Sequence, residues 1–203
     1  YLQPTKPITS FIMKEKPNVT NLNGKFLIAM PNMGDSRFKH AVIYICSHNE
    51  DGTMGLIINK TAINFNLSDL IKQLTLPTEI KPKTFPINIG GPVEPYRGFI
   101  LHTLDYVNEE NTVKVDQILG MTSTLDILED IASSKGPETF LVALGYSGWG
   151  AGQLELEIKN NGWLVSEANL EIIFNNNNST KWGEALKILG VDPILLSTDG
   201  GNA

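Results

Sequence analysis

The residues whose types and spacing could do chemistry begin with a glycine-rich stretch in the second half of the chain. The sequence L-G-Y-S-G-W-G-A-G-Q, which starts at Leu144, contains Gly145, Gly148, Gly150 and Gly152. It follows an apolar run that predicts a buried strand, and it precedes a segment that can begin a helix. Glycines at such a junction predict a sharp turn, whose backbone N–H groups could bind an anion at the start of the helix.

Two interpretations of this glycine stretch stay open. Its spacing differs from that of the dinucleotide-binding fingerprint, and it lacks the lysine and hydroxyl pair of a P-loop. The same glycines would also allow Tyr146 and Trp149 to pack in a tight corner. The stretch is therefore either a candidate anion site or a packing device.

Cys46 and His48 stand two residues apart at the end of a predicted strand, so their side chains can project to the same face. A cysteine–histidine nucleophile is one chemistry that this pair allows, with His40 or His102 close in space. It would need a thiolate of low pKa and an oxyanion hole, for which the sequence has no signature. A cysteine inside the apolar run A-V-I-Y-I-C is more typical of a small buried side chain.

Several residues of metal-ligand type fall near two predicted strand ends. They are His48, Glu50, Asp51, His102 and Asp105. No dense spacing such as H-x-x-x-H or D-x-D-x-D-G supports a metal site, and acidic side chains commonly stabilise turns. We therefore predict no metal and no cofactor.

Polar groups on the predicted loops form the remaining candidate site, because binding residues are often held on loops by a rigid scaffold. Arg97 lies three residues after Glu94, and the two could equally form an ion pair that fixes the preceding G-G-P turn. The candidate binding surface comprises Asp35, Arg37, His48, Asn49, Arg97, His102, Gly148, Gly150 and Gly152.

Short apolar runs predict the strands that must position these groups. The run Ala41–Cys46 is apolar at every position, which is typical of a central strand covered on both faces. The Asp-Gly pair within residues 47–53 predicts an antiparallel hairpin with a longer connection. The predicted strands are Lys25–Met30, Ala41–Cys46, Met54–Asn59, Pro86–Gly91, Arg97–His102 and Val113–Ile118.

Helical periodicity and capping residues predict the helices. The first predicted helix is capped by Asn66 or Ser68 and ends before Pro77. The second is capped by Thr122 or Ser123 and ends at Gly136-Pro137, and the third spans Thr180–Gly190. The segment Gln153–Ile158 alternates like a strand, but it also places Leu154 and Ile158 on one helical face, so local pattern favours neither structure.

Composition limits the class of protein. The chain has 203 residues, which suits one domain, and we divide it into an N-terminal arm at 1–23 and a single domain at 24–203. With 16 basic and 22 acidic residues its net charge is −6, which makes a nucleic-acid partner unlikely. One cysteine fits a reducing cytoplasm, and no apolar stretch approaches the roughly 18 residues of a membrane helix. We expect a cytoplasmic protein without a membrane partner.

The chain resembles the AlgH/YqgE family of bacterial proteins from about Gly24 to Ala203. Four blocks carry the resemblance in the same order: G-K-F-L-I-A-M-P-N-M from Gly24, H-N-E-D-G-T-M-G-L-I-I-N-K from His48, G-G-P-V-E-P-Y-R-G-F-I-L-H from Gly90 and L-G-Y-S-G-W-G-A-G-Q-L-E from Leu144. The chain departs from the family pattern at His40-Ala41, where a basic residue followed by serine is usual. It also ends Gly201-Asn202-Ala203 rather than G-H-A.

This resemblance implies an α+β fold in which a mixed, bifurcated β-sheet with a small barrel-like part is surrounded by helices. It also favours a helix after the glycine stretch. The function we expect is binding, with regulatory consequences, through a protein partner or a small anionic ligand, and the lack of catalytic spacing disfavours an enzyme. The alternatives are an enzyme that uses Gly145–Gly152 as an anion site, and the DNA-binding transcriptional regulator that some family names suggest.

Overall fold

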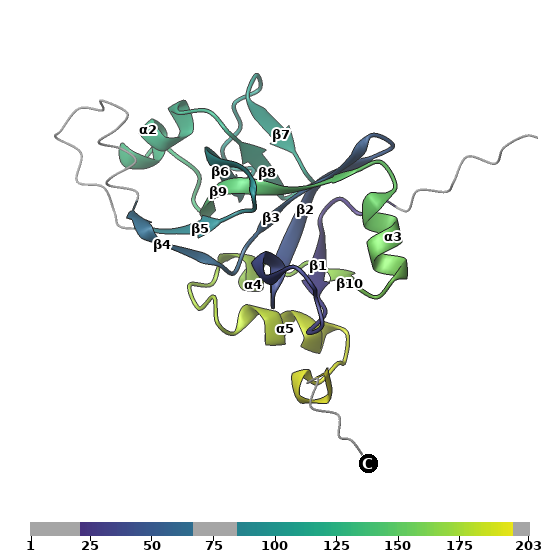
Figure 1. Cartoon of the computed structure of the whole chain (residues 1–203). Helices are drawn as coiled ribbons and strands as arrows, with labels where there is room; N and C mark the ends of the chain where they lie inside the picture. The colour runs from purple at the N-terminus through teal and green to yellow at the C-terminus, as the bar shows by residue number, and fades with distance from the viewer. Residues whose placement is uncertain (1–20, 67–84, 197–203) are drawn as a thin grey trace, which may run out of the picture.

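The computed structural model describes residues 21–66 and 85–196 (Figure 1). Its strands are β1 (Lys25–Ala29), β2 (Val42–Asn49), β3 (Gly52–Ile57), β4 (Thr61–Asn66), β5 (Pro86–Ile89), β6 (Val93–Thr103), β7 (Thr112–Lys114), β8 (Leu119–Thr122), β9 (Phe140–Gly150) and β10 (Trp163–Glu167). Its helices are α2 (Asp126–Ala132), α3 (Gln153–Lys159), α4 (Leu170–Phe174) and α5 (Lys181–Ile188), with short 3-10 turns η1 (Ser36–Phe38) and η2 (Pro193–Leu196).

Three predicted features lie outside the described residues. They are the N-terminal arm up to residue 20, the helix predicted between Asn66 and Pro77, and the C-terminal segment from residue 197. None of the helices in the described part of the chain is long and apolar enough to cross a membrane.

The strands form a curled sheet in the order β10-β1-β2-β3-β9-β6-β8-β7, with β5 attached to β9 and β4 to β5. The pairing of β5 with β9 is parallel, and the other strand pairs are antiparallel. Strand β9 is the fork of this sheet: its N-terminal part lies between β5 and β6, and its C-terminal part pairs with β3. The fold is therefore α+β with a mixed, forked sheet, as expected.

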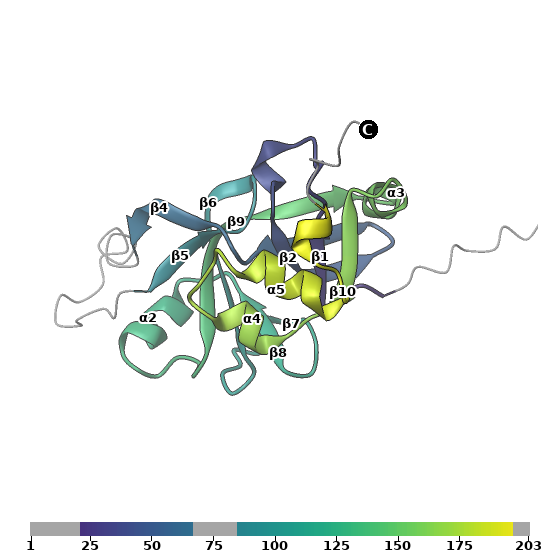
Figure 2. The same ribbon diagram turned by 90° about the horizontal axis from the view of Figure 1, so that it is seen from below.

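Both faces of the central strands are covered, which explains their unbroken apolar sequences. Along β2, every side chain from Val42 to Cys46 is at most 2% exposed. Side chains from one face pack against α4 and α5. Helix α5 lies across β1, β2 and β10, and α4 lies beside it (Figure 2). Those from the other face pack against Leu154 of α3 and the indole rings of Trp149 and Trp163. The prediction of a buried central strand is confirmed.

The sequence predicted a sharp turn at the glycine-rich stretch. That prediction is wrong, because β9 continues through Gly145 and Gly148 to Gly150. The chain between β5 and β6 crosses over β9 here, and a Cβ on Gly91 would lie 2.1 Å from the carbonyl carbon of Tyr146. Gly145 has φ +69°, and a Cβ on it would lie 2.5 Å from the Gly91 carbonyl oxygen. These two glycines allow two backbones to cross in contact.

Several element boundaries differ from those predicted. The β2–β3 hairpin has a tight turn at Glu50-Asp51 instead of a longer connection, because pairing continues to Asn49 opposite Gly52. Strand β6 begins at Val93 and not at Arg97, where the sequence predicted its start.

The segment around the predicted strand Val113–Ile118 folds into two strands, β7 and β8. Helix α2 has neither Thr122 nor Ser123 as its cap, since Leu125 occupies that position without a side-chain bond. The segment after Gly152 is helical, as the resemblance implied.

Candidate functional site

A cleft of about 540 Å³ lies beside the end of β9, between α3 and the loop that carries η1. Three aromatic rings form its wall. Phe38 stacks on Trp149 with ring centroids 6.4 Å apart, and it meets the edge of Trp163 at 5.6 Å. The two tryptophan rings are perpendicular to each other at 5.8 Å. Such pairs add to the free energy gained from burying the rings, so they form a rigid wall.

The carboxylate of Glu157 joins the aromatic wall to α3. Its Oε2 accepts the indole N–H of Trp149 at 2.9 Å and that of Trp163 at 2.8 Å. Its Oε1 accepts from Nε2 of Gln153 at 3.0 Å. Hydrogen bonds to an ionised carboxylate are among the stronger ones in proteins, so this network fixes the position of both rings.

A second hollow, of about 430 Å³, lies on the opposite face of β9. It is bordered by Asn49 and Asp51 from the β2–β3 hairpin and by Met54 and Tyr146. The two hollows share Val93, Gly148 and Trp149 in their linings. The end of β9 therefore forms a ridge between them.

One edge of this ridge is an open strand edge. Residues 147–150 of β9 pair with β3 along one side. On the other side, β6 pairs with β9 only as far as Val93, which lies opposite Tyr146. No strand among the described residues continues that pairing beyond Tyr146.

Gly148 directs its backbone polar groups to the open edge. The N–H and C=O groups of successive residues alternate between the two edges of an antiparallel strand. The N–H of Gly150 donates to Oε1 of Gln153 at 3.0 Å, so it points away from β3. Gly148, two residues earlier, points the same way and is exposed. Its N–H and C=O can therefore pair with an added chain.

Asp35 and Arg37 lie at the rim of the 540 Å³ cleft. The guanidinium donates to the carboxylate in a two-pronged ion pair, from Nε to Oδ1 at 3.0 Å and from Nη2 to Oδ2 at 2.6 Å. The hydrogen bonds from Arg37 lower the pKa of Asp35, and the same contact raises the pKa of Arg37. Because its charge is already matched, Arg37 is a weak attractor for a free anion.

The other predicted residues near β9 have different environments. Asn49 is exposed, and its side chain accepts the backbone N–H of Asp51. His48 is buried: its Nδ1 contacts the Thr53 hydroxyl at 2.7 Å, and its Nε2 lies 3.6 Å from Oε1 of Glu155. Gly152 precedes α3 in the left-handed conformation, with φ +72°.

Five predicted residues line neither hollow, namely His48, Arg97, His102, Gly150 and Gly152. Arg97 donates to Glu94 at 3.0 Å and to the Ser123 hydroxyl at 3.1 Å. His102 is fully buried, with Nε2 2.9 Å from the Thr122 hydroxyl, and burial lowers its pKa.

The nucleophile and metal alternatives find little support in the geometry. Cys46 is 2% exposed, and burial raises the pKa of its thiol to about 12. Within residues 21–66 and 85–196, no three His, Cys, Asp or Glu side chains gather as metal ligands. The polar groups around His48 and those around His102 thus remain separate.

Sequence reasoning missed Phe38, Glu157 and Trp163 as members of the cleft. Each is ordinary in its local sequence, and they come together only because η1, α3 and β10 meet at the end of β9. The one local signal is the i,i+4 spacing of Gln153 and Glu157, whose side chains are hydrogen-bonded.

Comparison with known proteins identifies the family of this chain. The model of the family described as AlgH-like matches residues 26–194. The chain belongs to the AlgH-like family. The UPF0301 protein of Ruegeria pomeroyi is 52% identical over 184 residues, which cover 90% of this chain and 100% of that protein.

Two solved structures share the fold of this AlgH-like protein. The AlgH protein from Pseudomonas aeruginosa is 38% identical, with a TM-score of 0.75, and the match covers 93% of this chain and 100% of that one. Protein DIP2367 from Corynebacterium diphtheriae has a TM-score of 0.68 at 24% identity, over 88% and 93% of the two chains, and shows similarity of fold alone. The names of these proteins state no ligand or reaction.

Proposed function

We propose that this AlgH-like protein is a binding protein that takes up an extended segment of a partner protein at the open edge of β9. The observation that carries the proposal is the exposed backbone of Gly148, which lies at an uncovered strand edge between two hollows. An extended segment that pairs with a sheet edge gains main-chain hydrogen bonds, and pockets for its side chains supply selectivity.

The two hollows suit the alternation of an added strand. Successive side chains of a strand point to opposite faces. One set would enter the cleft walled by Phe38, Trp149 and Trp163, and the other would enter the second hollow, at whose rim Asn49 and Asp51 supply polar groups. We therefore expect a partner segment with apolar or aromatic residues at alternate positions and polar or basic residues between them.

The glycines of β9 support this proposal. A Cβ on Gly150 would meet no described atom closer than 3.9 Å, and one on Gly148 would contact only the Tyr146 ring at 3.2 Å and more distant side-chain atoms. Neither glycine has the backbone conformation or close crossing that Gly145 requires. A bare strand edge at these positions leaves room for a second backbone.

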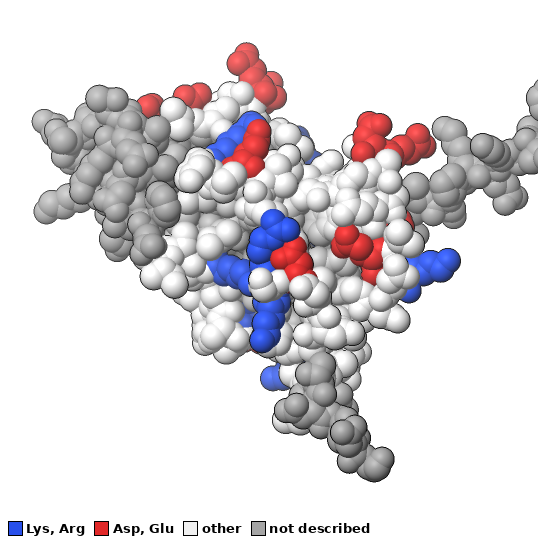
Figure 3. Space-filling view, viewed as in Figure 1, with Lys and Arg blue, Asp and Glu red and all other residues white. Residues whose placement is uncertain are grey.

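A small anion is less well matched to this place than a protein segment. The N–H of Gly150 is taken by Gln153, and the charge of Arg37 is matched by Asp35. A DNA duplex is also disfavoured, because the net charge is −6 and acidic and basic side chains are interspersed on the face seen in Figure 3.

The test uses two substitutions that differ only in the N–H group. Gly148→Pro removes the donor at the open edge, and an edge position tolerates proline because that N–H does not pair with β3. Gly148→Ala keeps the donor and adds a similar Cβ, so it is the matched control. Peptides selected on the wild-type protein from a random eight-residue library provide the probes.

We expect Gly148→Pro to weaken peptide binding by about tenfold or more, which corresponds to one lost hydrogen bond of about 1.4 kcal/mol. Gly148→Ala should change it much less. N-methylation of alternate peptide residues should abolish binding, whereas methylation of the residues between them should not. Equal affinity for the proline and alanine variants, both folded by circular dichroism, would show that the open edge is not the binding site.

A further inference from the structure

A buried lysine lies at the start of α5, beside a cavity that shares no lining residue with the two hollows at the open edge. Lys181 is the first residue of α5 and is 1% exposed. Its Nζ donates to the backbone carbonyls of Ile58 and Ile173, each at 2.8 Å. A lysine ammonium has three N–H donors, so one remains beyond these two bonds.

No acidic side chain among the described residues forms an ion pair with Lys181. Both groups that accept its hydrogen bonds are neutral carbonyls. The negative charge of Glu184 acts to raise the pKa of Lys181, but its carboxylate accepts a hydrogen bond from Nδ2 of Asn175 at 3.2 Å. Burial of a cation without a negative partner is costly, and an anion beside it would offset that cost.

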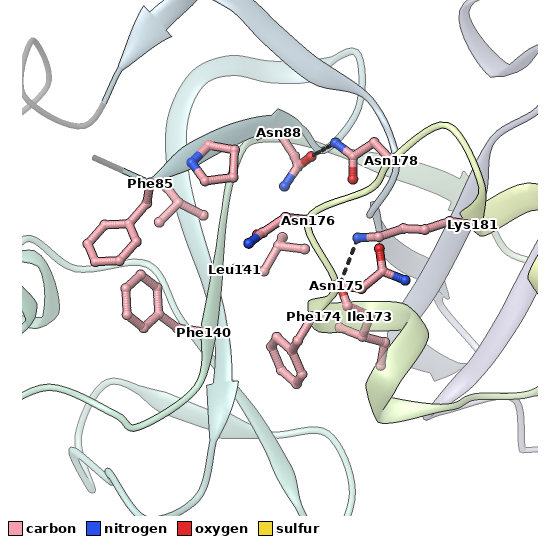
Figure 4. Close-up of a pocket in the computed structure, with 12 residues that line it drawn as sticks. Phe85, Asn88, Phe140, Leu141, Ile173, Phe174, Asn175, Asn176, Asn178 and Lys181 are labelled. Carbon is pink, nitrogen blue, oxygen red and sulfur yellow. Dashed lines mark hydrogen bonds between the residues drawn. The ribbon is translucent and has the colours of Figure 1, made fainter. Parts of the chain in front are cut away.

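A cavity of about 60 Å³ lies next to this ammonium group (Figure 4). A water molecule needs a cavity of roughly 10–15 Å³, so this cavity has room for a group larger than one water. Its lining is divided by chemistry. Lys181 lies at one end and Phe85 and Phe140 lie at the other, with Asn88, Asn176 and Phe174 between them.

Asn88 supplies a second donor to the same cavity. The residue is 3% exposed, and its Oδ1 accepts from Nδ2 of Asn178 at 2.8 Å. Its own amide nitrogen points the opposite way, toward Asn176 and the interior of the cavity (Figure 4). None of the described residues accepts a hydrogen bond from this nitrogen. It is therefore a donor at the lining of the cavity that a bound acceptor can use.

We propose that this cavity binds a short-chain organic carboxylate. The carboxylate oxygens accept hydrogen bonds from Nζ of Lys181 and Nδ2 of Asn88, and the aliphatic part lies toward Phe85 and Phe140. The combination of one cation, amide donors and an aromatic end matches a monoanion with an apolar tail. The site is independent of the proposed strand addition, because it involves the N-terminal part of β9 at Leu141 and not Gly148.

The experiment is a titration of the isotope-labelled full chain with sodium propionate, followed by NMR at the side-chain amides of Asn88 and Asn176. Both line the cavity, and the Asn176 amide is the signal that remains in a variant of Asn88. Propionamide has the same shape without charge, and sodium chloride and inorganic phosphate at equal ionic strength report on charge alone. Two variants accompany the wild type. Lys181→Met keeps a long unbranched side chain without the ammonium, and Asn88→Asp keeps the oxygen that Asn178 binds but replaces the donor.

We expect propionate to shift the Asn88 amide saturably, and we expect each variant to weaken binding by about tenfold or more, as loss of a hydrogen bond to a charged group implies. Propionamide should bind much more weakly than propionate. The proposal is wrong if propionate produces no saturable shift, or if chloride or phosphate saturates the same signals equally well. It is also wrong if folded Asn88→Asp protein binds propionate as the wild type does, a result that remains available should Lys181→Met fail to fold.

Discussion

Trp149 in β9 and Glu157 in α3 are joined by a hydrogen bond of 2.9 Å from the indole N–H to Oε2. The same oxygen accepts the indole N–H of Trp163 in β10, so one carboxylate connects three elements. Both rings are at least 93% buried, and water cannot readily replace the acceptor. This contact holds the end of β9 against α3 and so sets the shape of the cleft beside the open edge.

Replacing Glu157 should therefore destabilise the protein through its tryptophan residues. Glu157→Ala leaves two buried indole donors without an acceptor, at a cost of roughly 1–3 kcal/mol each. Glu157→Gln keeps one amide oxygen as an acceptor and should cost less. Urea denaturation followed by tryptophan fluorescence measures both. If the alanine variant were as stable as the glutamine variant, the two indole bonds would not contribute as described.

The glycines of β9 should fall into two groups when each is changed to alanine. Gly145→Ala places a Cβ 2.5 Å from the Gly91 carbonyl oxygen in a left-handed conformation, which alone costs about 1–3 kcal/mol. Gly150→Ala meets nothing closer than 3.9 Å and should change the free energy of unfolding by about 0.5 kcal/mol or less. Chemical denaturation of both variants tests the prediction. Equal effects would mean that the backbone crossing is not what requires glycine.

Cys46 should behave as a structural thiol. It is buried against apolar side chains, and its pKa is raised to about 12 by that burial, so little thiolate exists near neutral pH. A thiol reagent at pH 8 should label native protein slowly and denatured protein at once. The control is the rate of labelling as denaturant increases, which should follow unfolding. Rapid, complete labelling of the native protein would restore the nucleophile interpretation.

The fold was predictable where local sequence and tertiary environment agree. The run Ala41–Cys46 has no polar side chain to place on a solvent face, so it specifies a strand covered on both sides, and β2 is one. The helical state of α3 could not be decided locally. It is settled by Leu154, which is fully buried against the sheet, and by Glu157, which meets two indoles from other strands.

The candidate site was predictable only in part, for a similar reason. Asp35, Arg37, Asn49 and Gly148 do lie along the two hollows, although their role in binding stays a prediction. The turn predicted for the glycines was wrong because the need for glycine at Gly145 comes from a strand crossing more than 50 residues away in the sequence, at Gly91. The hydrophobic pattern around Gly91 and that around Gly145 give no sign that the two backbones are in contact.

The pH dependence of stability should carry a signature of Lys181. Burial lowers its pKa from 10.5 to about 8 in the folded protein. Between these values the unfolded chain holds more protons than the folded one, so the contribution of Lys181 to stability rises with pH. Below about pH 8 both states are protonated and the destabilising effect of the buried charge is constant.

The measurement is the free energy of unfolding of the wild type minus that of Lys181→Met, determined from pH 7 to pH 10. Taking the difference removes other groups that titrate in this range, including Tyr44, whose pKa burial raises. We expect the difference to be flat up to about pH 8 and then to increase in favour of the wild type, because neutral Lys181 keeps its bonds to Ile58 and Ile173 without a buried charge. A difference that falls with pH would mean that the folded protein stabilises the ammonium form, and would require an undetected negative partner beside it.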